Sequence, residues 1–176
     1  GNPVIPPSHR GAPPYASGLY GVDGRGGLPR KLPVDRGSLA SIAPDGKAMA
    51  FNRFGRHVRT WKRYEGGNAQ DVWVVEFASG DIRRITDFAG SDQFPMWGDG
   101  AIYFNSDRED GTLNLYRYDT ATEAVTRLTT FTDYDVKFPS LGDGRIVFQY
   151  GSGLSVLDLA SGQVAAVPIT IPSDRR

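Results

Sequence analysis

The chain of 176 residues contains no cysteine, only two histidines and no apolar run long enough to cross a membrane as a helix. Without cysteine, disulfide scaffolds, cysteine-ligated zinc sites and thiol nucleophiles are excluded. The 20 acidic and 20 basic residues cancel, whereas proteins that bind nucleic acid or an anionic membrane need a basic face. We therefore expect no nucleic-acid partner and no membrane partner.

Glycine and proline, by contrast, are abundant, with 22 and 12 residues. Both residues interrupt helices and suit short strands joined by turns. Five of the prolines lie in the segment 1–17, where they remove backbone donors that a paired hairpin needs. The composition predicts an all-β chain that begins with a Pro-rich segment.

One strand–turn–strand pattern occurs four times along the chain. Each copy has an apolar or aromatic strand that ends in an acidic residue, then a turn, then a second strand. Apolar residues alternate within the copies, as in residues 72–77, and this period of two is typical of strands. Equivalent residues of the two strands are 12 positions apart in every copy: Tyr20 and Leu32, Trp73 and Ile85, Tyr116 and Leu128, and Ser155 and Val167.

A second hairpin lies between these copies and occurs three times. Its turn is an Asp-Gly pair, at Asp45-Gly46, Asp99-Gly100 and Asp143-Gly144. Asp-Gly between apolar stretches is the strongest short signal for a hairpin, because glycine adopts the positive φ that the turn requires. The two hairpins together make four antiparallel strands per repeat.

The repeat length is 43 residues from Trp73 to Tyr116 and 54 residues from Asp45 to Asp99, and it is longest where residues 56–70 are inserted. Four strands in about 45 residues indicate a blade of a β-propeller. We predict three and a half blades with these boundaries: Pro-rich segment 1–17, half blade 18–35, full blades 36–86, 87–130 and 131–172, and tail 173–176.

Three and a half blades do not close a propeller ring, which takes about four to eight. An open arc would leave a blade face and sheet edges exposed. Three explanations remain open. The chain is part of a longer polypeptide, a second copy completes the ring, or the Pro-rich segment and residues 169–176 patch a closed four-blade ring.

Several motifs follow one another in a characteristic order. The most specific are the insertion RTWKRYEGG from Arg59 and the run FTDYDVK from Phe131. The others are FPMW from Phe94, IYFNSDR from Ile102, NLYRYD from Asn114, LDLASGQ from Leu157 and VPITIP from Val167. In this order they resemble the N-terminal propeller region of bacterial tricorn-type proteases, over residues 10–172. The Ser-Asp-Arg and Asp-Gly motifs alone would also fit the propellers of the Tol system and of prolyl oligopeptidases.

The resemblance implies propeller blades that precede a PDZ-like module and a serine peptidase domain, and that filter or channel peptides towards a catalytic chamber. The catalytic residues of such proteins lie in the C-terminal domain, so none is carried over to this chain. The resemblance also favours a bacterial, periplasmic protein, although the compartment stays open. Residues 1–3 start neither a basic nor an apolar stretch, so we expect no signal peptide within the chain.

The residues themselves predict no catalytic activity for this chain alone. The two histidines, His9 and His57, lie in the Pro-rich segment and in the insertion, and the nucleophile-elbow motif G-x-S-x-G does not occur. The acidic loop 107–110 lacks the spacing and the twelfth ligand of a calcium loop. We expect neither a metal nor a cofactor.

The insertion carries the first candidate ligand site. Arg56, Arg59, Lys62 and Arg63 lie in it, next to the ring of Trp61 in sequence. Arginine forks beside aromatic rings suit a peptide carboxylate or a protein partner, so an acidic peptide is one expected ligand. The alternative is that the aromatic residues fix the longer loop to the adjacent blade, while the cations are solvated or stacked on the rings.

Asp133 and Asp135 form the second candidate site. They directly precede an expected innermost strand, where propeller loops open onto the axis. They suit the amine of a ligand, but local hydrogen bonding in a turn explains aspartate at these positions equally well.

We therefore expect a non-catalytic propeller module of a tricorn-like serine peptidase, which binds or channels peptides or mediates assembly. The alternative is a Tol-like scaffold for protein–protein interaction, in which two half-propellers associate into one ring. The expected partners are a peptide or protein, a second copy of the chain, or the remainder of a longer chain.

Overall fold

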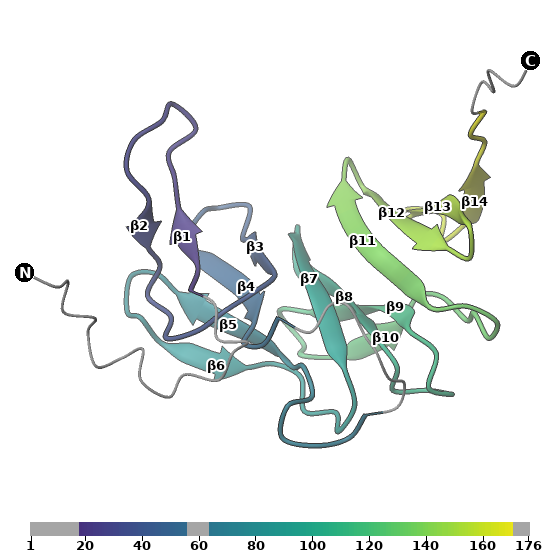
Figure 1. The fold of residues 1–176 in the computed structure, drawn as a ribbon, viewed down its shortest axis with the longest axis horizontal. Helices are drawn as coiled ribbons and strands as arrows, with labels where there is room; N and C mark the ends of the chain where they lie inside the picture. The colour runs from purple at the N-terminus through teal and green to yellow at the C-terminus, as the bar shows by residue number, and fades with distance from the viewer. Residues whose placement is uncertain (1–17, 56–63, 171–176) are drawn as a thin grey trace, which may run out of the picture.

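The computed structural model describes residues 18–55 and 64–170. These residues form fourteen strands, arranged in one two-stranded and three four-stranded antiparallel sheets (Figure 1). Neither range contains a helix, and so neither contains one that could span a membrane. The all-β class and the four-stranded blades predicted from the sequence are confirmed.

The strands follow one another within each blade in chain order. The half blade consists of β1 (Tyr20–Gly21) and β2 (Arg30–Lys31). The first full blade has β3 (Ala40–Ile42), β4 (Ala48–Asn52), β5 (Val72–Glu76) and β6 (Ile82–Arg84). The second has β7 (Asp92–Gly98), β8 (Ala101–Ser106), β9 (Asn114–Asp119) and β10 (Val125–Arg127). The third has β11 (Val136–Gly142), β12 (Arg145–Tyr150), β13 (Gly153–Asp158) and β14 (Val164–Val167).

Both kinds of predicted turn are present. Gly46, Gly100 and Gly144 adopt φ values of 72°, 66° and 70° in the hairpins between the first and second strands of the blades. In the second and third blades, the acidic residue that ends the third strand accepts hydrogen bonds from its own turn. Asp119 Oδ1 accepts hydrogen bonds from two backbone N–H groups, at 2.9 and 3.0 Å. Asp158 Oδ1 accepts one from a backbone N–H group at 3.0 Å. These bonds explain the aspartate at this position of the second and third blades.

The hydrophobic core lies between the blades. One buried cluster joins the first blade to the second and includes Ala50, Val72, Val74, Ile102, Phe104 and Tyr116. Another joins the second blade to the third and includes Met96, Leu115, Val136, Ile146, Phe148 and Leu157. A third joins the half blade to the first blade and includes Val34, Met49, Phe51 and Val75, with Leu19 and Leu32 packed against them. Packing between blades accounts for the aromatic residues that recur at equivalent strand positions.

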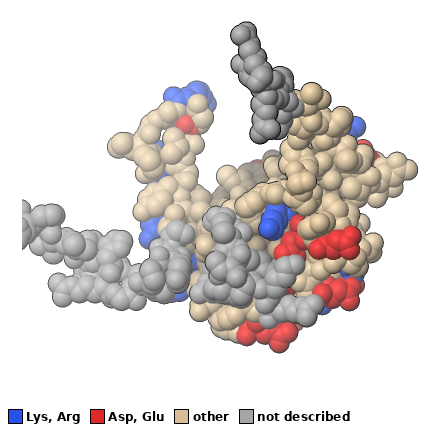
Figure 2. Space-filling model, turned by 45° about the vertical axis from the view of Figure 1, so that its right-hand side comes forward, with Lys and Arg blue, Asp and Glu red and all other residues tan. Residues whose placement is uncertain are grey.

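The blades follow one another along an arc, with the half blade at one end and the third blade at the other (Figure 1). The segments 1–17 and 171–176 lie outside the described residues, so a closed ring patched by the two ends of the chain stays a prediction. Figure 2 shows acidic side chains gathered along the lower edge of that view, and no broad basic area on the described surface that faces the viewer.

Candidate functional site

The innermost strands of the three blades lie next to one another. β7 contacts both β3 and β11, and each of the three is an edge strand of its own sheet. Together they form a groove of about 290 Å³, lined by Leu39, Ala40, Ser41, Phe94, Pro95, Met96, Trp97, Pro139, Ser140 and Leu141. An edge strand leaves a row of backbone N–H and C=O groups without a partner in the sheet. Part of the β7 edge is occupied, because the N–H groups of Phe94 and Trp97 donate to Asn52 Oδ1 and Ser41 Oγ. The groove therefore offers apolar walls and only the remaining backbone groups of the three edges.

Phe94, in the wall of this groove, and Phe138, which precedes the wall residue Pro139, have strained backbone conformations. Phe94 and Phe138 adopt φ values of 55° and 49°, and each lies where the register with the second strand of its blade shifts. The left-handed region costs a bulky residue about 1–3 kcal/mol. The two rings meet edge to face, with centroids 5.9 Å apart and planes at 88°. The second and third blades share this conformation, whereas Ala40, which lies five residues before the Asp-Gly turn of the first blade, does not adopt a positive φ.

Asn52 connects the first blade to the strained segment of the second. Its Nδ2 donates to the backbone oxygens of Asp71 and Asp92, at 2.8 and 2.9 Å, and its Oδ1 accepts from the Phe94 N–H at 3.1 Å. The side chain is fully buried, so water does not compete for these bonds. Asn52 therefore fixes the start of β7 and the bulge that carries Phe94.

Asn105 takes the equivalent position in the second blade, with fewer bonds. Its Nδ2 donates to the backbone oxygen of Val136 at 3.0 Å, but its Oδ1 is buried without a hydrogen-bond partner in the described part of the chain. The third blade has Gln149 here, and its Nε2 donates to the backbone oxygen of Gly151 at 3.1 Å, within its own loop. The bridge between blades thus loses bonds from the first blade to the third.

A buried ion pair lies beside this bridge. Arg108 Nη2 donates to both carboxylate oxygens of the fully buried Asp92, at 3.0 Å each. The guanidinium also lies over the rings of Phe88, Phe104 and Tyr116, with its carbon 5.6, 5.4 and 5.1 Å from their centroids. Burial raises the pKa of Asp92, and the charge of Arg108 opposes this rise. The pair joins the loop after β8 to the first residue of β7, which makes it part of the support of the groove.

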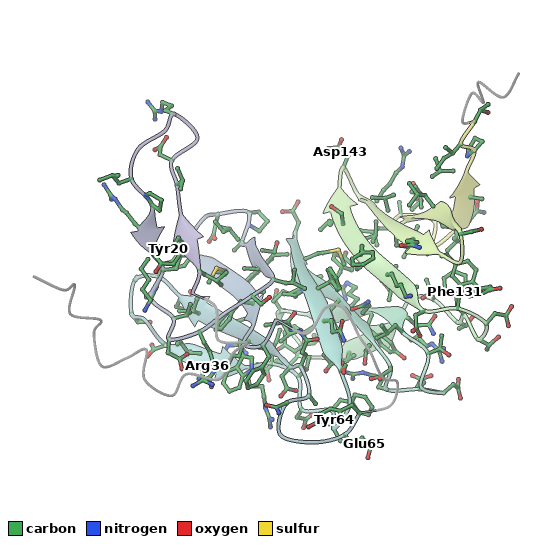
Figure 3. All side chains as sticks on the ribbon, viewed as in Figure 1. Tyr20, Arg36, Tyr64, Glu65, Phe131 and Asp143 are labelled. Atoms are coloured by element: carbon green, nitrogen blue, oxygen red, sulfur yellow. The ribbon has the colours of Figure 1, made fainter. Side chains whose placement is uncertain are left out.

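The predicted basic site cannot be placed. Arg56, Arg59, Lys62 and Arg63 lie outside the described residues, so their role in ligand binding stays a prediction. The first described residues of the insertion, Tyr64 and Glu65, lie at the end of the molecule opposite Asp143 (Figure 3).

Arg53, just before the insertion, is placed and has two partners. Its guanidinium lies over the ring of Trp73, with its carbon 4.9 Å from the centroid, and its Nη2 is 2.8 Å from Asp35 Oδ2. A hollow of about 480 Å³ lies here, with Phe54, Asp71 and other residues of the first blade in its wall. Arg53 is thus stacked on a ring and paired with a carboxylate. This agrees with the interpretation in which cations of this region stack on aromatic rings and do not bind a ligand.

Asp133 and Asp135 have different surroundings. Asp135 is buried, and its Oδ1 accepts a hydrogen bond from the Leu113 N–H at 3.0 Å. Asp133 is exposed, and its Oδ1 accepts a hydrogen bond from Thr132 Oγ1 at 3.2 Å. The Asp133 contact is local, as expected of aspartate in a turn, whereas the Asp135 bond reaches 22 residues back to the segment before β9. A ligand role for the two carboxylates stays a prediction. Within the described residues, no cluster of three or more acidic or histidine side chains could hold a metal ion.

Sequence reasoning did not single out the strained phenylalanines or the asparagine bridge. A signal for the former is present, because Phe94-Pro95 and Phe138-Pro139 both lie five residues before the Asp-Gly turn. A residue before proline is driven out of the right-handed helical region, but this preference alone favours an extended conformation. The positive φ values therefore required the three-dimensional structure.

Comparison with known proteins places the chain in a family. The model of the tricorn protease N-terminal beta propeller domain matches residues 1–163. The chain belongs to this family. This tricorn-type propeller is 29% identical over 157 residues to a tricorn protease homolog of Saccharolobus solfataricus, which covers 89% of the chain and 14% of that protein. It is 30% identical over 143 residues to tricorn protease homolog 1 of Streptomyces coelicolor, which covers 76% of the chain and 13% of that protein.

Solved structures share the fold of the tricorn-type propeller. The crystal structure of the tricorn protease superposes with a TM-score of 0.76 at 21% identity, over 92% of this chain and 15% of that one. A putative TolB from Agrobacterium tumefaciens superposes with a TM-score of 0.67 at 22% identity, over 86% of this chain and 56% of that one. The family match is to a propeller domain of a protease and not to a catalytic domain.

Proposed function

We propose that the chain is a non-catalytic propeller module that binds or channels peptides within a tricorn-like serine peptidase. The observation that carries this proposal is the groove of about 290 Å³ between three innermost edge strands. Edge strands bind extended peptides through backbone hydrogen bonds, and pockets along the strand select alternate side chains. A groove of this kind suits an extended peptide better than a compact small molecule.

Equilibrium dialysis of the 176-residue chain against a mixed panel of short synthetic peptides tests this function, with mass spectrometry as the readout. We expect peptides to be retained over free amino acids and to be recovered intact. Absence of retention for every peptide would contradict peptide binding. Cleavage of the peptides by the purified chain would contradict a non-catalytic module.

A second candidate function is a self-associating scaffold, and the outer face of the third blade favours it. We call Val147, Leu154 and Val156 on this blade the open face. Val147 and Leu154 are 38% and 39% exposed, although both are apolar residues in a sheet. If two copies complete one ring, light scattering should give a stable dimer of about twice 19.2 kDa. A cooperatively unfolding monomer at every concentration would contradict the scaffold.

A further inference from the structure

We propose that the open face of one copy of the chain binds the half blade of a second copy, head to tail. The inference rests on the second candidate function, the self-associating scaffold, and names the two surfaces that meet. One surface is the open face on the third blade. The other consists of Tyr20, in β1, and Val22, and we call it the half-blade face.

The open face repeats a surface that binds a blade within the chain. In the first blade, Ala50, Val72 and Val74 occupy the equivalent positions. Ala50 pairs with Val74 across β4 and β5, in the same register in which Val147 pairs with Val156 across β12 and β13. All three residues of the first blade are buried in the cluster that joins it to the second blade. The open face therefore has the aliphatic surface that receives a following blade.

The half-blade face repeats the surface that is received. Tyr20 pairs with a basic residue of β2 in the register in which Tyr116 pairs with a basic residue of β10. Tyr116 and Tyr118 are only 1% and 3% exposed, because they pack in the cluster between the first and second blades. Tyr20 and Val22, at the equivalent positions, are 60% and 56% exposed. Figure 3 shows Tyr20 at the half-blade end of the molecule.

Every full blade buries the position that Val22 occupies. The equivalent residues are Val75, Tyr118 and Leu157, and all three are buried in the clusters between neighbouring blades. In each case, the blade or half blade that comes earlier in the chain provides the cover. The half blade itself has no earlier blade among residues 18–55 and 64–170. The open face of a second copy supplies the surface that Val22 lacks.

The polar bridge gives an independent reason for a half blade as the partner. Asn52 and Asn105 donate to or accept from the innermost strand of the following blade, β7 or β11. The described half blade has only the two strands equivalent to the third and fourth of a blade, so it offers no innermost strand. Gln149, at the bridge position of the third blade, donates within its own loop. A half-blade partner therefore leaves no bond of this bridge unmade.

The two faces lie at opposite ends of the arc (Figure 1). Contact between two different surfaces is heterologous, and it closes a ring when each copy uses both of its surfaces. Each copy contributes three four-stranded blades and one half blade, so two copies place eight such units in a ring, within the range of known propellers. Contact between two open faces would instead leave both half-blade faces exposed.

Cross-linking distinguishes these two arrangements. The chain has no cysteine, so Val22→Cys and Leu154→Cys each place a single thiol on one face. The two variants are treated with a short bis-maleimide, each alone and as a mixture, and denaturing electrophoresis measures the covalent dimer. We expect the dimer from the mixture only, because thiols on two copies of the same face belong to different contacts.

A second variant tests the contact without cross-linking. Tyr20→Ala should weaken association about tenfold in the dissociation constant measured by analytical ultracentrifugation, because buried tyrosines contribute strongly to interfaces. Tyr134→Ala is the matched control. Tyr134 is 57% exposed, and its ring packs on Tyr150, with centroids 5.7 Å apart, and not on either face. Circular dichroism verifies that both variants are folded.

The outcomes separate this inference from the scaffold function. A covalent dimer from the mixture alone, together with weaker association of Tyr20→Ala but not of Tyr134→Ala, supports the inference. A covalent dimer from Leu154→Cys alone, no covalent dimer from any sample, or unchanged association of Tyr20→Ala overturns the inference and leaves the scaffold in place. If the unmodified chain stays monomeric at every concentration, both are overturned. Peptide binding is tested separately and is unaffected by any of these results.

Discussion

The second and third blades have the same apolar face, which is buried in the second blade and partly exposed in the third. Leu115 in β9 pairs with Asn105, and Leu154 in β13 pairs with Gln149 at the equivalent position of the repeat. Leu115 is fully buried against the third blade, whereas Leu154 is 39% exposed. The comparison teaches that the repeat encodes a contact surface for the next blade as well as the blade itself.

The polar bridge between neighbouring blades also has fewer hydrogen bonds towards the C-terminal end of the chain. Asn52 makes three hydrogen bonds, two of which reach the second blade, and Asn105 makes one bond to the third. Gln149 bonds within its own loop. Both the apolar face and the bridge are therefore complete between the first two blades and incomplete at the open face. The variants below are chosen to break this contrast or to measure it.

The largest expected effect concerns the start of β7. Asp92→Ala would remove the ionic partner of Arg108, a side chain only 19% exposed, at a cost of about 3 kcal/mol in the free energy of unfolding. The third blade has Val136 at the equivalent position, and Val136→Ala should cost less, because it removes only apolar contacts. Urea unfolding followed by circular dichroism measures both. An equal or smaller loss for Asp92→Ala would contradict the structural role of the ion pair.

The matched leucines give the most direct contrast. Leu115→Ala should cost about 2–5 kcal/mol, because it opens a cavity between two blades. Leu154→Ala should cost about 0.5 kcal/mol or less in a monomeric sample, since surface substitutions rarely cost more. The same unfolding experiment at low protein concentration compares them. Similar losses for both variants would mean that the open face is covered in solution.

The bridge should show a smaller contrast. Asn52→Ala leaves buried backbone groups of β7 without partners, and we expect a loss of about 1–3 kcal/mol. It should also increase amide hydrogen exchange at Phe94, whose N–H bonds to Asn52 Oδ1. Gln149→Ala is the control at the equivalent position and should leave stability nearly unchanged. Equal amide exchange at Phe94 in both variants would contradict a structural role for the Asn52 bridge.

The smallest expected effect concerns pH. Hydrogen bonds from the backbone of Thr122, with help from Arg117, lower the pKa of Asp119 from 3.8 to about 2. A carboxyl group with a lower pKa in the folded chain adds stability above its unfolded pKa, and this contribution is lost as the pH falls towards 2. Asp119→Asn should therefore reduce the decline in stability between about pH 4 and pH 2. A carboxyl titration by NMR with a midpoint near the ordinary value would contradict the turn contacts.

The fold was predictable from the sequence to a large extent, and the candidate site only in part. The Asp-Gly pairs and the spacing of 12 residues defined the hairpins, because turn chemistry and strand alternation are local properties. The positive φ of Phe94 and Phe138 and the bridge from Asn52 depend on contacts between blades, which a local pattern does not contain. The basic insertion around Arg59 and Arg63 lies outside the described residues, so its prediction is neither confirmed nor contradicted.

The central claim is that the open face is a blade-binding surface, and the solution mass tests it most directly. Light scattering across a concentration series should show the 19.2 kDa chain associating as its concentration rises. Val147→Lys with Leu154→Lys should keep it monomeric, because two charges on the face cannot be buried without partners. Leu28→Lys, at an exposed position on the half blade, should associate like the unmodified chain. An unmodified chain that stays monomeric at every concentration, or an open-face variant that associates equally well, would contradict the account.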